Sequence, residues 1–344
     1  MREKKLVYEV NVIRPLVILL LVVFHCFCVH AKNWDPIPGV FDIPAYYWIA
    51  NFISGFQLET MAVVCGYIYA FQAIDLKKEY SLGNFMRKKG QRLLVPCLFW
   101  GVIYFFVILQ PLQEYSFGQA LFIISNGSGH LWFLPMIFWC FVFLWLIHRH
   151  SPSRLLAFVV LSALSVLPVP ALPFGLTRMP HFAFYAYAGY CLWIYREQLH
   201  GFFLKKRWVL LFAASYMSLL YWDCSLEHFG EEGYTMPLYA KILTRVLKYF
   251  IVFTGVLSLY LSVCLFTVKR GITPPRWVIQ SSKICFGVYI FHQFILKYLY
   301  YLTPMPEIVG SAALPWVGLA IALPLSILLS LLFVQTKVGR SLIG

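Results

Sequence analysis

A succession of long apolar runs constrains this chain more than any other feature. A helix needs about 20 apolar residues to cross a bilayer. Hydrophobic residues make up 61% of the 344 residues and charged residues only 12%, too few to cover a soluble globule. The sequence therefore predicts an all-α polytopic membrane bundle. Ten helices are expected, at residues 8–30, 46–73, 93–111, 130–147, 155–171, 181–196, 208–224, 240–267, 284–303 and 308–334.

The lysines and arginines lie mainly in alternate loops. When the N-terminus is assigned to the cytoplasm, 21 of the 28 fall in cytoplasmic segments and only 3 on the opposite side. This asymmetry follows the positive-inside rule and predicts that both termini are cytoplasmic. The net charge of +14 therefore indicates topology. No nucleic-acid partner is expected, because no soluble segment carries a basic stripe with stacking aromatic residues.

The remaining sequence indicates one membrane domain over residues 1–344. The charged start and first apolar run are also typical of a cleavable signal peptide, but the length of the run and its poor cleavage context favour an uncleaved helix. The nine cysteines form no CxxC pair and are expected to fill the core. Motifs of soluble enzymes such as GxGxxG, HExxH and GxSxG are missing, and no metal is expected.

Two ionisable residues, Arg14 and His25, lie inside the first apolar run. A charge in the hydrocarbon region costs at least about 2.5–3.5 kcal/mol on insertion scales, so such residues are functional candidates. Eleven helical steps separate the two residues by about 16 Å and about three turns, which places both side chains on one face. The first span is therefore predicted to carry a polar track.

Further ionisable residues lie inside the other predicted spans. Lys248 and Lys297 are expected to extend to the external interface. Glu59 is either a structural partner of a cation or part of a site. His292 follows Tyr289 by three residues, on the same helical face, and is either a hydrogen-bonded core histidine or a site residue. The full set is Glu59, Arg245, Lys248, His292 and Lys297.

Several segments, taken in order, resemble the membrane-bound acyltransferase 3 family. Arg14 and His25 form an R-x10-H pattern that resembles the opening signature of these integral membrane O-acyltransferases, which modify bacterial surface glycans. In two places the chain departs from the pattern, because Cys65 replaces a serine and Glu59 a proline. Neither departure affects Arg14 or His25. The matching segments are VIRPLVILLLVVFH, FQLETMAVVCGYIYA, FMRKKGQRLLVPCLFW, GHLWFLPMIFW, SSKICFGVYIFH and the C-terminal VGRSLIG.

The resemblance implies acyl transfer in the cytoplasmic (inner) membrane of a bacterium. The donor would be cytoplasmic acyl-CoA, with acetyl-CoA expected, and the acceptor a sugar hydroxyl of a surface polysaccharide or lipid-linked glycan. His25 is the candidate general base or acyl carrier, because imidazole, with an ordinary pKa of about 6.5, exchanges protons near neutral pH. Arg14, nearer the cytoplasm, is expected to orient the donor through its planar fork of N–H groups.

Donor-binding residues are expected in the basic loop at residues 74–92. Arg92 matches the family's arginine before a leucine pair and a proline, and Lys88 lies one turn earlier. Together with Arg87, these residues are predicted to bind the phosphates of CoA. The alternative is that their charges serve only the positive-inside rule.

Acceptor contacts are predicted toward the external side. His130 and Trp132 open the fourth span beside the loop SNGSG, whose small residues leave room for a sugar. Tryptophan is also common as a membrane-belt residue. Glu59, Tyr289 and His292 complete the predicted substrate contacts.

Three other functions remain open at the level of sequence. A glycan exporter or flippase of related sequence would keep the helical bundle and need no CoA site. An ion-coupled transporter would use the same intramembrane charges, although no paired interrupted helices occur in matching halves. A structural or partner-binding subunit would need neither Arg14 nor His25.

Overall fold

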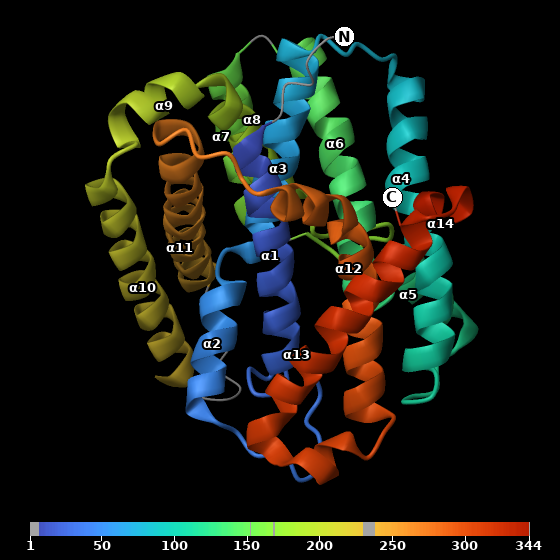
Figure 1. The fold of residues 1–344 in the computed structure, drawn as a ribbon. Coiled ribbons are helices and arrows are strands. Elements are labelled where there is room, and N and C mark those ends of the chain that lie inside the picture. Colours follow the sequence, from blue (N-terminus) through green and yellow to red (C-terminus); the bar gives the residue numbers. More distant parts are fainter. Residues whose placement is uncertain (1–6, 152, 168, 230–237, 344) are drawn as a thin grey trace.

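The computed structural model describes residues 7–151, 153–167, 169–229 and 238–343, and within these ranges it contains helices and no strand (Figure 1). The α-helices are α1 (Tyr8–Phe27), α2 (Pro44–Ser54), α3 (Gln57–Ala70), α4 (Leu82–Tyr104), α5 (Phe117–Asn126), α6 (Phe133–His150), α7 (Arg154–Val166), α8 (Met179–Ile194), α9 (Arg196–Phe203), α10 (Lys206–Phe229), α11 (Leu238–Cys264), α12 (Arg276–Tyr301), α13 (Met305–Val334) and α14 (Lys337–Leu342). Short π or 3-10 turns are η1 (Phe71–Asp75), η2 (Phe105–Leu109), η3 (Gly129–Trp132) and η4 (Leu265–Lys269).

Six helical segments of the described chain are long and apolar enough to cross a membrane. Large apolar side chains such as Phe106, Leu155 and Leu210 are exposed on the outside of the bundle, where lipid rather than water is the favourable solvent. The chain is therefore an all-α, multi-pass membrane protein, as the sequence predicted. The six segments are Tyr8–Phe27, Pro44–Asp75, Leu82–Leu109, Gly129–His150, Leu243–Lys269 and Met305–Val334.

The predicted fifth span, residues 155–171, is too long. Its helix, α7, ends at Val166 after 13 residues, and the chain is not regular again until α8 begins at Met179. Pro170 and Pro173 explain this, because a proline cannot donate the helical hydrogen bond and it disfavours a helical conformation in the residue before it. An irregular segment therefore connects α7 to α8.

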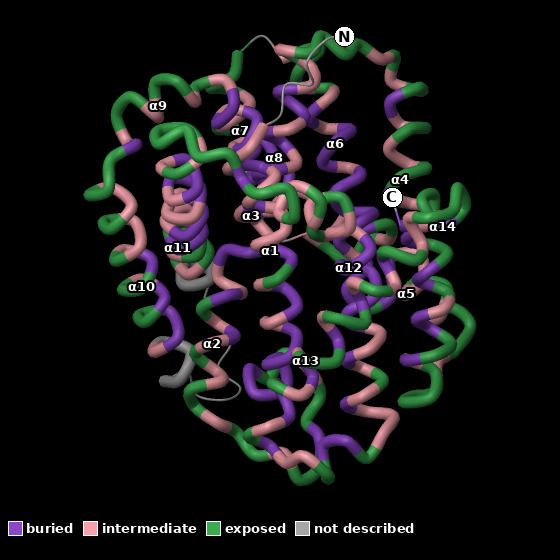
Figure 2. Tube along the Cα trace, in the orientation of Figure 1, coloured by how far each residue is buried: buried purple, intermediate pink, exposed green. Residues whose placement is uncertain are grey.

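Helix α1 lies at the centre of the bundle and packs against α2, α3, α11, α12 and α13. Buried residues are concentrated along α1, α3, α6 and α8, while α5 and α9 bury none (Figure 2). Pro15 lies inside α1 and cannot donate to the carbonyl of Asn11, four residues earlier. The helix that carries Arg14 and His25 is thus surrounded by protein.

Helices α3 and α8 approach each other closely through two glycines. A Cβ on Gly66 of α3 would lie 1.7 Å from the carbonyl oxygen of Ala186, and a Cβ on Gly189 of α8 would lie 1.9 Å from that of Val63. Small residues at such contacts let helix backbones approach closely in membranes. The contact therefore requires glycine at both positions.

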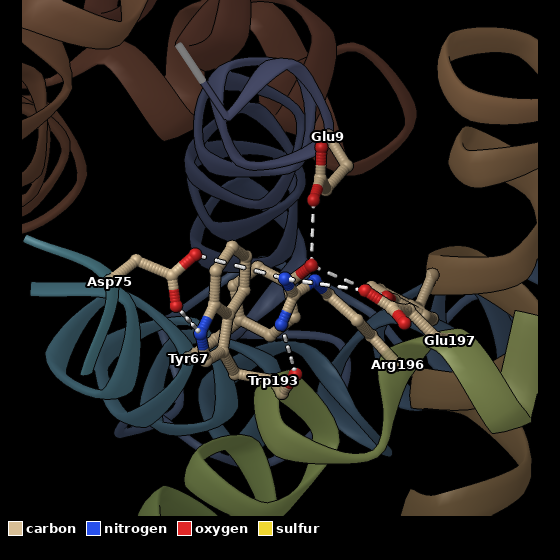
Figure 3. A network of polar contacts seen from close by, with 7 residues as sticks. Glu9, Tyr67, Asp75, Trp193, Arg196 and Glu197 are labelled. Carbon is tan, nitrogen blue, oxygen red and sulfur yellow. Dashed lines mark hydrogen bonds and ion pairs between the residues drawn. The ribbon is translucent and has the colours of Figure 1, made fainter. Parts of the chain in front are cut away.

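A polar network joins α1 to α3, α8, α9 and α11 near the end of the bundle where α1 begins (Figure 3). Tyr67 donates to Glu9 over 2.6 Å, and its hydroxyl lies 3.4 Å from that of Tyr260. Tyr260 in turn pairs with Nε2 of His200 at 2.9 Å. Burial lowers the pKa of His200 below its ordinary value. Beside this series of hydrogen bonds, Arg196 lies 3.7 Å from the carboxylate of Asp75.

Candidate functional site

A cavity of about 460 Å³ runs along α1 and is called the Arg14 cavity below. Asn11, Arg14, Ile18 and Leu21 form its wall on α1, which is the helical face predicted to carry the polar track. These residues span about 15 Å along the axis. His25 follows Leu21 by one turn, so the row of residues that lines the cavity leads to this histidine.

Basic residues line one part of the Arg14 cavity. Arg14 faces Lys89 and Arg92 of α4 across it, and Lys283 of α12 also lines it. The Nζ atom of Lys89 lies 3.4 Å from the centre of the Phe141 ring. Cations that line one cavity repel one another, so an anionic ligand is the natural complement of this wall.

Two of the predicted donor contacts do not line this cavity. With about 100° per residue in a helix, Lys89 and Leu93 lie to one side of Arg92 and form the cavity wall with it. Lys88 lies about 90° from the middle of that wall, and its Nζ sits 3.9 Å from the centre of the Tyr80 ring. Arg87 lies on the opposite face of α4. The sequence analysis missed Lys89, although helical spacing from Arg92 indicates it.

Three histidines meet beyond the inner end of the Arg14 cavity. Nε2 of His292 lies 2.9 Å from Nδ1 of His25. The ring of His130 is centred 5.0 Å from that of His292 and 6.4 Å from that of His25. All three are buried. They come from α1, η3 and α12, so the structure brings together His25 with two of the residues predicted as acceptor contacts.

The hydrogen bonds of the cluster define its tautomers. Nδ1 of His292 lies 2.9 Å from the carbonyl oxygen of Val288, and a carbonyl only accepts, so this nitrogen carries the proton. In neutral His292, Nε2 is then an acceptor and must receive the Nδ1–H of His25. Nε2 of His25 therefore keeps a lone pair. The His25 ring also hydrogen-bonds the backbone carbonyl of Leu21, one turn earlier in α1.

His130 is held firmly by α12. Its backbone N–H donates to Oε1 of Gln293 over 2.8 Å, and its backbone oxygen accepts from the Tyr289 hydroxyl over 2.5 Å. Its Nε2 donates to the carbonyl of Ile290, which leaves Nδ1 buried without a partner. Tyr289 also lines the Arg14 cavity, so it connects that cavity to the histidines.

The loop SNGSG does not provide the predicted space for a sugar. Gly127 and Gly129 adopt φ values of 86° and 59°, which favour glycine. A Cβ on Gly129 would lie 2.6 Å from the Tyr104 ring, and one on Gly127 would lie 2.6 Å from the backbone of Leu131. These glycines therefore serve close packing.

The other predicted acceptor contacts lie in a second cavity of about 420 Å³, called the Arg245 cavity below. Trp132 and Glu59 line it, and Glu59 pairs with Nε2 of His181 at 3.3 Å. The guanidinium of Arg178 lies 3.9 Å from the centre of the Trp132 ring. Burial lowers the pKa of Arg178, but an arginine remains charged. The predicted substrate contacts are thus divided: Glu59 and Trp132 line the Arg245 cavity, Tyr289 lines the Arg14 cavity, and His130 and His292 lie in the histidine cluster.

No group of three or more His, Cys, Asp or Glu side chains in the described ranges is arranged to hold a metal ion. In the histidine cluster, Nε2 of His292 and Nδ1 of His25 face each other and do not converge on a shared position where a metal ion could bind.

Comparison with known families identifies the chain. Residues 7–335 match the acyltransferase 3 family, which is described as an acyltransferase domain. The match covers nearly the whole chain, so the chain belongs to this family, and the resemblance seen in its motifs is confirmed. Comparisons with curated proteins and with solved structures found no match. The protein is therefore a membrane acyltransferase, with an acyl donor and an acceptor.

Proposed function

We propose that this acyltransferase 3 protein transfers an acyl group, most simply acetyl, from cytoplasmic acyl-CoA to a sugar hydroxyl of a surface or lipid-linked glycan. The observation that carries the proposal is the Arg14 cavity, with cations around one end and His25 one turn beyond the other. Acyl-CoA matches this polarity, because its phosphates are anionic and its thioester lies at the end of a long flexible arm.

In the proposed reaction, His25 acts as the general base. Its Nε2 takes the proton of the acceptor hydroxyl while the hydroxyl oxygen attacks the thioester carbonyl. The carbon–sulfur bond breaks, the ester forms, and the proton passes from Nε2 to the departing CoA sulfur. Atoms and charges balance without a further reactant. Formation of a transient acyl-His25 is the alternative route to the same products.

His292 orients His25 in this scheme. It accepts the Nδ1–H of His25 and donates its own Nδ1–H to Val288, which fixes the ring and favours the imidazolium that forms during transfer. This is a positioning role. The donor phosphates are assigned to Arg14, Arg92 and Lys89, with Arg14 nearest to the thioester along α1.

Replacement of His25 tests the proposal. We expect His25→Ala to lower acyl transfer by about 10²–10⁴-fold, the contribution typical of a general base. Surface glycans of a deletion strain complemented with each variant are analysed by mass spectrometry, and acetyl-CoA binding is measured on the purified full chain. His30→Ala is the matched control, because His30 is a buried histidine five residues away that pairs with no ring nitrogen of the cluster.

Two outcomes would contradict the proposal. His25→Ala with near wild-type glycan modification would end the catalytic assignment. Wild-type protein that neither binds acetyl-CoA nor alters the glycan, while glycan export fails in the deletion strain, would instead favour the exporter alternative.

The proposal includes an orientation with ten membrane spans and both termini in the cytoplasm of a bacterial cell. The positive-inside distribution supports this orientation. We expect an impermeant thiol reagent to label Glu114→Cys in intact cells and to label Lys88→Cys only after permeabilisation. Both positions are exposed in the structure. Labelling of Lys88→Cys in intact cells would place the basic wall on the outer face and contradict the cytoplasmic donor.

A further inference from the structure

The Arg245 cavity gathers positive charge where the protein otherwise has little. Arg178, Arg245 and Lys248 line it, against the single carboxylate of Glu59. In the proposed orientation this is the external end of the bundle, whose loops contain only three lysines or arginines in the whole sequence. Positive residues are disfavoured there, so three of them around one cavity indicate a specific use.

Two of the cations in this cavity, Arg178 and Arg245, are bound by protein without a carboxylate partner in the part of the chain that the structure describes. The Arg178 guanidinium lies over the Trp132 ring, and Arg245 donates to the carbonyl of Val166. Neither forms an ion pair within the described ranges, where Glu59 instead pairs with His181. The second carboxylate oxygen of Glu59 is buried without a partner. The cavity therefore presents both positive charge and an open acceptor.

Aromatic and apolar groups form the rest of the wall. Trp132, Phe182 and Tyr249 line the cavity, together with Leu167 and Val169 of the irregular segment after α7. Sugar rings have apolar faces that stack on such side chains while their hydroxyls remain hydrogen-bonded. A wall of this kind next to two arginines fits an acidic sugar better than a neutral one, because a guanidinium binds carboxylate or phosphate through two parallel hydrogen bonds.

The two cavities share one aromatic wall. Phe133 lines the Arg14 cavity, and its ring is centred 5.9 Å from that of Phe182, which lines the Arg245 cavity. Trp132 lies two residues after His130 and packs on Phe182 at 5.7 Å. A ligand in the Arg245 cavity is therefore close to the histidine cluster.

We propose that the Arg245 cavity binds the acceptor through an anionic group, a carboxylate or phosphate, so that the acceptor is an acidic glycan or a glycan on a phosphate-containing lipid. This inference rests on the proposed acyl transfer and specifies its acceptor class. Arg178 and Arg245 hold the anion, Trp132 supports a sugar ring, and Glu59 accepts a hydroxyl.

Binding of defined probes to the full chain in lipid nanodiscs tests the inference. Isothermal titration calorimetry compares a disaccharide ending in glucuronate with its glucose counterpart, and a polyprenyl diphosphate with the corresponding polyprenol. We expect at least one anionic probe to bind about tenfold more tightly than its neutral partner, as a charge-assisted hydrogen bond provides. Preference for glucuronate places the charge on the sugar, and preference for the diphosphate places it on the lipid.

Matched variants locate the anion. Arg245→Gln and Arg178→Gln are expected to abolish the preference for the anionic probe, while Arg245→Lys retains part of it. Arg270→Gln is the control, because Arg270 is an exposed arginine that also lies over an aromatic ring but outside the cavity. Thermal stability of each variant identifies any that fails to fold, and the conservative lysine variant then provides the comparison.

The outcomes separate this inference from the proposed function. Equal binding of charged and neutral probes by the wild type, or a preference that survives both glutamine variants, would overturn the acidic acceptor. Acyl transfer with no dependence on acceptor charge would do the same and leave the transferase intact. Anion binding at Arg245 combined with full activity of His25→Ala would overturn the catalytic assignment and leave the anion site standing.

Discussion

Two buried polar networks of this protein use similar side chains in different ways. In the first, His200, Tyr260, Tyr67 and Glu9 are linked by successive hydrogen bonds, and the space beside them holds about 10 Å³. In the second, His25, His292 and His130 are also linked or packed, but Nε2 of His25 keeps a lone pair and a cavity of about 460 Å³ ends nearby.

The difference distinguishes a structural network from a candidate site. A buried polar group that is satisfied by protein stabilises one arrangement of helices. A buried side chain that protein holds on one side, while its other polar atom remains able to bind a substrate, is already oriented for reaction. Burial and residue type alone do not separate the two cases, because both networks contain a histidine and both join α1 to other helices.

After replacement of His25 itself, the largest expected effect comes from the histidine that orients it. His292→Ala removes the acceptor of the Nδ1–H of His25, and we expect kcat to fall about 10²-fold, as for a reacting group displaced by about 1 Å. His200→Gln, in the structural network, should leave kcat within about twofold. Steady-state kinetics on the purified variants measure both. Equal losses would remove the distinction between the two networks.

A smaller effect is expected in donor binding. Arg14→Lys keeps the charge but loses the planar fork, and we expect the KM for acetyl-CoA to rise about tenfold with a smaller change in kcat. A titration of acetyl-CoA binding separates affinity from chemistry. Unchanged affinity would make Arg14 a structural residue, comparable to Glu9 in the closed network.

Neighbouring lysines on α4 provide a finer test. Lys89 lines the Arg14 cavity and Lys88 does not. We expect Lys89→Gln to raise the KM for acetyl-CoA a few-fold, the effect of one partly solvated point charge. Lys88→Gln should leave it unchanged. The reverse pattern would show that the basic wall is assigned to the wrong face of α4.

The smallest effect on activity is expected in the closed network. Tyr67→Phe leaves the buried carboxylate of Glu9 without its donor, which costs about 1–3 kcal/mol of stability. The melting temperature in detergent should fall while kcat and KM stay near those of the wild type. A selective loss of activity without a lower melting temperature would indicate that this network also takes part in function.

Much of the architecture could be predicted from the sequence, because it depends on interactions between residues that are close in sequence. Apolar runs of about 20 residues specify membrane helices, and the period of 3.6 places Arg14 and the row leading to His25 on one face. The irregular segment after α7 was missed because the apolar run continues past Val166 even though the helix does not.

The arrangement of the site could not be predicted in the same way. His25 and His292 are 267 residues apart in sequence, and nothing in either helix specifies the other. Glu59 and Trp132 share a cavity with Arg178 and Arg245 only because α3, η3, α8 and α11 meet there. The prediction grouped Glu59 and Trp132 with His130, His292 and Tyr289 and left out Arg178 and Arg245, since sequence reasoning has no measure of which helix faces meet.

The close contact between Gly66 and Gly189 has a consequence for how such proteins diversify. Helix α3 supplies residues to both cavities and α8 supplies residues to the Arg245 cavity, yet neither helix can accept even a methyl group at these two positions. Leu167 and Val169 of the irregular segment after α7 and Tyr249 of α11 also line the Arg245 cavity, and in that segment the comparable restriction falls on Gly175, whose Cβ would lie 2.5 Å from the backbone nitrogen of Met136. New acceptor preferences could therefore arise by changes in those two segments, while the partition that separates the substrates is inherited intact.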